Sequence, residues 1–224
     1  KRQFEMDLLV TDADLVSSIV DTQRDLISFS KSIDEFTPSG FIATEQRDLL
    51  KQFEGDSYTE KKDQAFIDLA LASLDTTRSF DLPLKCKAKS NLNVPFGKPR
   101  GGGASGRGRF IARNWLETEV IVGKKITSIA GYPELMSFYV LTDDGWVFEC
   151  KTQGDYSKNF RSSSSLDVLG AWIKGRLINS DCIKYGDFIK EDALDRYGRK
   201  SIRLTATSLT ERGLPLFFLD FRTP

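Results

Sequence analysis

The amino-acid sequence predicts an α+β, mainly β, barrel-like domain that follows a helical segment. From Phe80 onward, apolar and polar residues alternate in short runs separated by turn residues, which is the period of half-buried strands. Only two helical patterns interrupt these runs, and many short strands with few helices are typical of barrel-like folds. Forty per cent apolar residues, including 16 Phe, are enough to fill such a core.

Three helices are expected before Phe80, after a short strand at residues 4–10. Their capping residues are Thr11 or Asp12, Thr44 and Thr59. The apolar face of the first helix recurs every three to four residues, at Leu15, Val16, Ile19, Val20, Leu26 and Ile27. The second helix ends at Phe53 and the third at about Leu74. Because residues 65–74 are almost wholly apolar, we expect the third helix to be buried.

The runs expected to form strands share the two-residue alternation. They cover residues 82–88, 110–111, 119–122, 138–141, 146–151, 202–205 and 217–221. In the first run Lys85, Lys87 and Lys89 occupy the outward positions. The turn Thr142-Asp143-Asp144-Gly145 is a strong hairpin signal.

Two helices are expected among these strands. Ser165 is expected to cap a helix whose apolar positions continue to Leu177. A shorter helix at 192–197 ends at Gly198, the usual residue after a helix.

The chain is neutral, but its charge is divided unevenly. Residues 1–82 carry 9 Lys and Arg against 17 Asp and Glu, a net charge of 9 − 17 = −8. Residues 83–224 carry 23 against 15, a net charge of +8. This division predicts an acidic helical linker at 1–82 and a domain at 83–224 that binds a polyanion.

Several classes of protein are excluded. The chain has no histidine, which rules out Ser-His-Asp and Cys-His catalysis and metal sites that need histidine from this chain. Cys86, Cys150 and Cys182 are too widely spaced for a zinc site, so we expect reduced thiols, no metal and no cofactor. No run approaches the roughly 18 apolar residues of a membrane span, and no signal peptide is present. We therefore expect a cytoplasmic protein without membrane contact. Because the chain begins at Lys1, we expect a piece of a longer protein.

The strongest functional signal is a glycine-rich basic loop from Val94 to Arg113. Between Asp81 and Glu117 the sequence has no acidic residue. Glycine allows a backbone to approach another surface closely, and arginine offers a planar fork that fits phosphate oxygens and guanine edges. The loop predicts binding to duplex DNA or, as an arginine-glycine segment, to RNA.

A second polar loop runs from Gln153 to Ser165. Its Lys158, Asn159 and Arg161 belong to the residue types that read bases, and serines donate hydrogen bonds to phosphates. The alternative is a turn that only caps the following helix. Two such loops on one β-rich domain favour duplex DNA.

A different alternative is a Mg²⁺-dependent nuclease. Such enzymes hold the ion with acidic side chains near a lysine that helps to activate water. Asp143 or Asp144 would act with Glu149 and Lys151. The two aspartates lie in a tight turn only five or six residues before Glu149, which argues against this site.

The second half of the chain resembles a known family through an ordered set of motifs. These are Gly-Arg after the glycine run, the Thr142–Gly145 turn, Lys158-Asn159, Leu169-Gly170-x-Trp172-Ile173-Lys174-x-Arg176-Leu177, Leu194-x-x-Tyr197-Gly198-Arg199 and Phe218-Leu219-Asp220-Phe221. Over about residues 83–224 they resemble the C-terminal domain of NgoFVII/NgoAVII-type restriction endonucleases. Those enzymes join a phospholipase-D-like nuclease to a DNA-recognition domain with the pseudobarrel fold of the plant B-three domain.

The resemblance implies a seven-stranded open pseudobarrel with short helices that recognises a short duplex sequence by two arms in the major groove. The implied N-arm residues are Lys98, Arg100, Ser105, Arg107, Arg109 and Arg113. The implied C-arm residues are Gln153, Asp155, Tyr156, Ser157, Lys158, Asn159, Arg161, Ser162, Ser163 and Ser164. The family's catalytic His-x-Lys pair is absent, so no catalytic residue is expected here. Cleavage, and any homodimer, would belong to a missing N-terminal nuclease portion of a type II restriction endonuclease.

Overall fold

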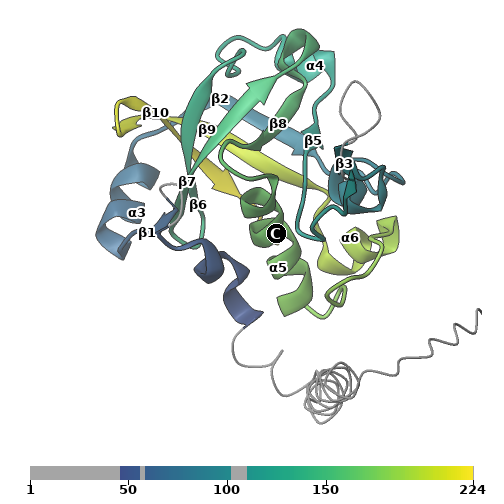
Figure 1. Cartoon of the computed structure of the whole chain (residues 1–224). Coiled ribbons are helices and arrows are strands. Elements are labelled where there is room, and N and C mark those ends of the chain that lie inside the picture. Colours follow the sequence, from purple (N-terminus) through teal and green to yellow (C-terminus); the bar gives the residue numbers. More distant parts are fainter. Residues whose placement is uncertain (1–45, 56–58, 102–109, 224) are drawn as a thin grey trace, which may run out of the picture. The chain divides into compact units, whose positions relative to one another are not determined.

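The computed structural model describes residues 46–55, 59–101 and 110–223, whose arrangement is shown in Figure 1. The strand expected at 4–10, the first expected helix and the start of the second lie outside these ranges. In the described ranges no helix has the length and apolar character that crossing a membrane requires.

One mixed sheet of eight strands forms the framework. Seven strands follow the order β2-β9-β10-β6-β7-β8-β5, and the short β1 pairs with β7. Strands β10 and β6 run parallel, whereas the other pairs are antiparallel. No pairing between described residues joins the edge strands β2 and β5, so the sheet is not closed. The expected α+β, mainly β character is confirmed, with eight strands in place of seven.

The strands of this sheet are β1 (Glu60–Lys61), β2 (Leu74–Pro83), β5 (Val120–Ile121), β6 (Ser137–Thr142), β7 (Trp146–Gln153), β8 (Asn159–Ser162), β9 (Ser201–Glu211) and β10 (Leu214–Asp220). A separate two-stranded pair, β3 (Arg100–Gly101) and β4 (Phe110–Ile111), lies outside the main sheet.

Helix α5 (Leu166–Asn179) packs on the inner face of the sheet (Figure 1). Its side chains are buried on nearly every side among aromatic residues such as Phe138, Phe160 and Phe221, so it has no continuous polar face. The 3₁₀ segment η1 (Gln46–Phe53) packs against it. The apolar sequence of α5 therefore reflects a helix that forms the centre of the core.

Gly170 allows α5 to touch the segment that enters β5. A Cβ atom at this position would overlap the carbonyl oxygen of Leu116 and approach the hydroxyl of Thr118 to 2.8 Å. Leu166 also accepts a hydrogen bond from the backbone N–H of Thr118 at 3.1 Å. Only glycine permits this approach, because any side chain would occupy the space of a backbone atom.

Helix α3 (Gln64–Ala72) covers part of the opposite face, where a second apolar cluster lies. It is shorter than the helix expected at 59–74, because Asp63 caps its first turn and the chain then enters β2. Leu69 and Leu71 are 53% and 36% exposed. The expectation that this whole apolar run is buried is therefore wrong: one side of the helix has no partner among the described residues.

Strand β2 starts well before the expected strand at 82–88 and ends at Pro83. Lys85, Lys87 and Lys89 therefore follow the strand rather than line its outer face, and that expectation is wrong. Beyond Pro83 the chain leaves the sheet, after a hydrogen bond from the N–H of Leu84 to the carbonyl oxygen of Lys200 at 2.8 Å.

Strand β2 also crosses residue 82, the boundary predicted from charge. The division into an acidic and a basic domain stays a prediction, since residues 1–45 lie outside the described ranges.

Three local features expected from turn and cap chemistry are confirmed. The 142–145 turn joins β6 to β7, with Gly145 at φ +90°. Ser165 caps α5 by accepting the N–H of Asp167 at 3.2 Å. Helix α6 (Glu191–Tyr197) ends at Gly198, which has φ +86°. All three cysteines are free thiols.

Two glycines of α5 should respond in opposite ways to substitution by alanine. Gly170→Ala should lower the free energy of unfolding by about 3 kcal/mol or more, because the added methyl group overlaps backbone. Gly175→Ala should be neutral or stabilising by about 0.5–1 kcal/mol, because its Cβ would meet only Leu49 side-chain atoms, at 3.6 Å or more. Urea denaturation followed by tryptophan fluorescence measures both. Equal effects would contradict the close approach at Leu116.

Candidate nucleic-acid interface

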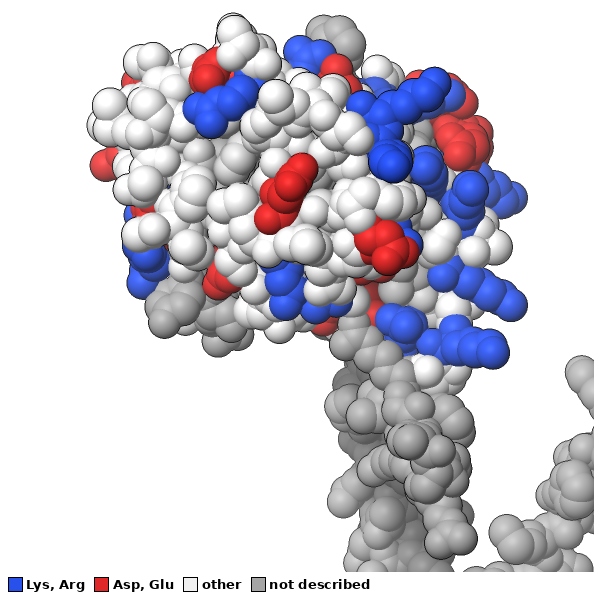
Figure 2. Space-filling view, turned by 90° about the horizontal axis from the view of Figure 1, so that it is seen from above, with Lys and Arg blue, Asp and Glu red and all other residues white. Residues whose placement is uncertain are grey.

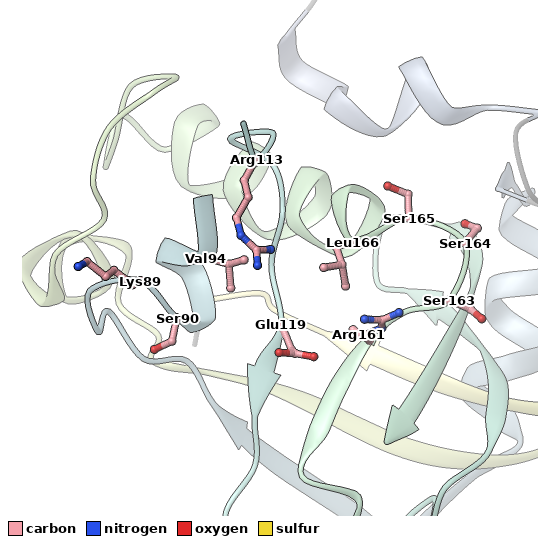
Figure 3. Close-up of a pocket in the computed structure, with 10 residues that line it drawn as sticks. All are labelled: Lys89, Ser90, Val94, Arg113, Glu119, Arg161, Ser163, Ser164, Ser165 and Leu166. Atoms are coloured by element: carbon pink, nitrogen blue, oxygen red, sulfur yellow. The ribbon is translucent and has the colours of Figure 1, made fainter. Parts of the chain in front are cut away.

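An open groove of about 450 Å³ lies between the loop after β2, the chain entering β5 and the start of α5 (Figure 3). Lys89 and Ser90 lie on one side, Ser163 and Ser164 lie on the other, and Arg161 lies between them. The complete lining is Lys89, Ser90, Val94, Arg113, Glu119, Arg161, Ser163, Ser164, Ser165 and Leu166. The groove thus joins the base of the predicted N-arm to the predicted C-arm.

Strand pairing places polar side chains in rows across β7, β8 and β5. Lys151 is opposite Arg161, and since Val120 is opposite Phe160, Glu119 lies beside Arg161 on the other side. A second row holds Gln153, Asn159 and Ile121, which are paired in the same way. The intervening residues of these strands, such as Phe160, point into the core, so both rows share the outward face.

Two polar atoms of these rows have no partner among the described residues. The Nε of Arg161 and the Oδ1 of Asn159 are buried, and neither has a hydrogen bond there. A buried polar atom without a hydrogen bond costs about 1–3 kcal/mol. Arg161 lines the groove, and an unsatisfied polar atom at such a place calls for an explanation, of which a polar partner that enters the groove is one.

The N-arm is described only at its base, where β3 pairs with β4. Lys98 is exposed there. Arg113 donates to the carbonyl oxygen of Lys98 at 2.8 Å and forms an ion pair with Glu117 at 2.7 Å, so it ties the two ends of the arm together. The expected contact residues Ser105, Arg107 and Arg109, and the side chain of Arg100, lie outside the described part.

The predicted C-arm, residues 153–165, begins with a tight loop between β7 and β8 that contains the 3₁₀ turn η3 (Asp155–Ser157) and continues through β8. Tyr156 and Ser157 both have positive φ, 47° and 57°, which is uncommon for residues with a side chain. Tyr156 is 48% exposed. Lys158 forms an ion pair with Asp155 at 2.9 Å and lies 5.6 Å from the ring centre of Tyr156.

The serines of the C-arm differ in their surroundings. Ser157 is buried and accepts the N–H of Leu135 at 3.0 Å, which fixes the loop to its neighbour. Ser162 is buried too: its hydroxyl donates to the carbonyl of Ser165 and accepts the N–H of Leu169 at 3.2 Å. Ser163 and Ser164 instead line the groove. The last two are therefore the better placed to meet a ligand.

Positive charge gathers on one side of the described surface, as Figure 2 shows. This is the side on which Figure 1 places β3 and α6. Lys87 and Lys89, which precede the N-arm, and Lys98 at its base are exposed. A surface of this kind attracts a polyanion and orients it toward the groove.

Comparison with known families agrees with this geometry. The family described as the NgoFVII C-terminal B3-like DNA-binding domain matches residues 70–208, which is more than half of the chain. The chain belongs to this family. The resemblance inferred from its motifs is therefore confirmed, and the domain is a B3-like DNA-binding domain. A search of curated proteins found no match.

The B3-like domain holds the exit of its N-arm with a buried lysine that the sequence did not reveal as functional. Lys174 of α5 donates to the carbonyl oxygen of Trp115, and to that of Glu117 at 3.2 Å. Its ammonium also lies 4.8 Å from the ring centre of Trp115, whose Nε1 donates to the carbonyl of Asp187 at 2.9 Å. Burial lowers the pKa of Lys174 to about 7, although Asp167 and Glu117 oppose that effect.

The aspartates of the 142–145 turn serve the scaffold of the B3-like domain. Asp143 forms an ion pair with Arg176 and accepts the N–H of Phe221 at 2.7 Å. Asp144 accepts the indole N–H of Trp172 at 3.0 Å. Burial raises the pKa of Asp143 to about 6 despite the charge of Arg176.

The expected Mg²⁺ ligands are not brought together. Asp144 contacts α5 on the inner face of the sheet. Glu149 and Lys151 lie on the opposite face, since Phe148 and Cys150, with which they alternate, point into the core. Across the described ranges, no three acidic or cysteine side chains are grouped as a metal site would require. The geometry therefore favours nucleic-acid binding at this strand over metal-dependent cleavage.

Lys174 should make stability depend on pH. Its folded pKa of about 7 lies below the ordinary value of 10.5, so between these values only the unfolded chain keeps the proton. The free energy of unfolding should therefore rise with pH in that window, by up to about 1.4 kcal/mol per unit. Denaturation of the protein and of Lys174→Met from pH 7 to 9 measures this. The Lys174→Met variant should show no such rise in the free energy of unfolding, whereas the control Lys125→Met, at an exposed site, should show it. Equal pH slopes for the protein and both variants would contradict a lowered pKa at Lys174.

Proposed function

We propose that this B3-like domain recognises a specific short sequence of duplex DNA, with the N-arm and the C-arm of an open pseudobarrel in the major groove. DNA binding follows from membership of the B3-like DNA-binding family. Specific readout is supported by one observation: half-buried polar side chains form one row across β7, β8 and β5 and a second across β7 and β8, and two of their atoms have no partner among the described residues.

The proposed contacts divide into base readout and phosphate binding. Arg161 has a planar fork that fits guanine, and Asn159 can form a pair of hydrogen bonds with adenine. Lys158 would also contact a base after its ion pair with Asp155 is broken. From the N-arm, the proposed base-reading residues are Arg100, Arg107 and Arg109. Ser163 and Ser164 would hold phosphates at the edge of the groove.

We also propose that the chain is the recognition part of a type II restriction endonuclease in the cytoplasm. Cleavage would then be carried out by a nuclease portion of the same polypeptide, which would also provide any homodimer contact. The support is the restriction-enzyme family of the domain and the scaffold role of Asp143 and Asp144.

Arginine and lysine in the groove should have different effects on specificity. Arg161→Ala should weaken binding to the cognate duplex by roughly 5- to 150-fold and binding to random DNA less, because a bidentate base contact is lost. Lys89→Ala should weaken both by a similar factor and reduce the salt slope by about one, as expected for a phosphate contact. Fluorescence anisotropy over a salt series measures both.

The control is Arg203→Ala, which removes an exposed arginine of β9 that pairs with Asp81 outside the groove. It should leave both affinities unchanged. If Arg161→Ala reduces cognate and random binding by the same factor, the groove is only an electrostatic surface. Competition with single-stranded RNA completes the test, because stronger binding to RNA would contradict recognition of duplex DNA.

The chain should bind its cognate duplex without cutting it. Glu149 and the aspartates lie on different faces of the sheet, so Mg²⁺ or Mn²⁺ has no acidic cluster there to bind. Incubation of a labelled cognate duplex with each metal, followed by gel analysis, tests this. Cleavage that Glu149→Ala abolishes would instead establish a nuclease site.

A further inference from the structure

Among the described residues that line the groove, Glu119 is the one that carries a carboxylate, and the other polar lining residues are cations and serines. Its charged neighbours in the lining are Lys89, Arg113 and Arg161. An acid at this place repels phosphates and therefore weakens non-specific binding to DNA. Because an ionised carboxylate only accepts hydrogen bonds, a ligand that binds Glu119 must donate them.

Glu119 does not neutralise the cations around it. Arg113 pairs with Glu117 instead, at 2.7 Å. Within the described residues, the carboxylate of Glu119 has neither an ion pair nor a hydrogen bond. In Figure 3, Glu119 and Arg161 point into the same space from adjacent strands. Both charges therefore remain available to a ligand.

The backbone around Glu119 is held firmly. The N–H of Glu119 donates to the carbonyl of Asn91 at 3.4 Å, and the N–H of Ile121 donates to the Oδ1 of the same asparagine at 3.0 Å. Val120 between them is buried and pairs with Phe160. A side chain held from both ends in this way keeps a fixed position, as base readout requires.

Base edges explain a carboxylate next to an arginine. In the major groove guanine offers two acceptors, which arginine binds with two hydrogen bonds, and cytosine offers the N4 amino donor, which Glu or Asp accepts. We propose that Glu119 is a specificity-determining residue that accepts a hydrogen bond from the N4 amino group of a cytosine, beside the guanine that Arg161 reads. This inference rests on the proposed recognition of duplex DNA.

The test is selection of binding sites from randomised duplexes by the full chain and by two variants. The protein should select cytosine at one position. Glu119→Ala should lose that preference, with about tenfold weaker cognate binding. Glu119→Gln should shift the position toward adenine, because an amide can pair with adenine N6 and N7. Both variants should bind random DNA as tightly as the protein or more tightly at low salt, since a negative charge is removed.

Modified duplexes separate this contact from a general loss of affinity. N4-methylcytosine at the selected position should weaken binding of the protein about tenfold and should not weaken Glu119→Ala further, because both changes disrupt the same contact. A duplex with 5-methylcytosine keeps the N4 amino group and is the matched control. Glu134→Gln, which changes an exposed acid outside the groove lining, should behave as the unsubstituted protein. Circular dichroism establishes that each variant is folded.

The outcomes distinguish this inference from the proposed function. If the protein selects a sequence and the folded Glu119 variants select the same one, the cytosine contact is wrong while duplex recognition stands. The cytosine contact is also wrong if N4-methylation weakens binding equally with and without Glu119. If the protein itself selects no sequence, recognition fails and the inference fails with it.

Discussion

The contact between Gly170 and the carbonyl group of Leu116 fixes the position of the segment that leads from the predicted N-arm into β5. Helix α5 is buried on the inner face of the sheet, so the segment that leaves the N-arm must pass directly over it. Lys174, one helical turn further along, donates to the carbonyls of Trp115 and Glu117 in the same segment. The exit of the N-arm is therefore attached to a helix buried in the core, and β5 starts from a defined place.

That attachment brings two distant parts of the sequence into one groove. From the fixed start of β5, pairing with β8 places Glu119 beside Arg161, and pairing of β8 with β7 adds Lys151. Arg113 meanwhile joins the two ends of the N-arm through Lys98 and Glu117. Paired strands and the buried helix α5 thus position the groove side chains. Recognition sites that are fixed in this way lose less conformational entropy on binding.

Much of the scaffold could be predicted from the sequence because its signals are local. The 142–145 turn, the Ser165 cap and the end of α6 at Gly198 each depend on a few neighbouring residues, and all three are confirmed. Strand β8 was not predicted, because its four residues include the polar Asn159 and Arg161 and give no clear apolar alternation. Pairing with β7 and β5 on its two sides holds it as a strand. The Glu119–Arg161 neighbourhood also escaped, because it depends on a pairing between segments about forty residues apart. The two arms, which charge, glycine content and the family resemblance predicted, stay a prediction, as do the residues through which they would meet DNA.

Two sets of charged residues differ in whether their charges are paired, and this difference distinguishes the scaffold from the candidate site. Asp143, Asp144 and Arg176 satisfy one another and nearby backbone and indole groups at the inner end of the β6–β7 turn. On the outer face, Arg161 keeps a buried Nε without a hydrogen bond among the described residues, and Glu119 lies beside it without forming an ion pair. The charged groups of the β6–β7 turn are thus paired at a place where they contribute to stability. Unsatisfied polar groups next to an open, basic groove support the proposed binding role of this face, and their opposite charges suit base edges, which offer both donors and acceptors, better than phosphate, which offers only acceptors.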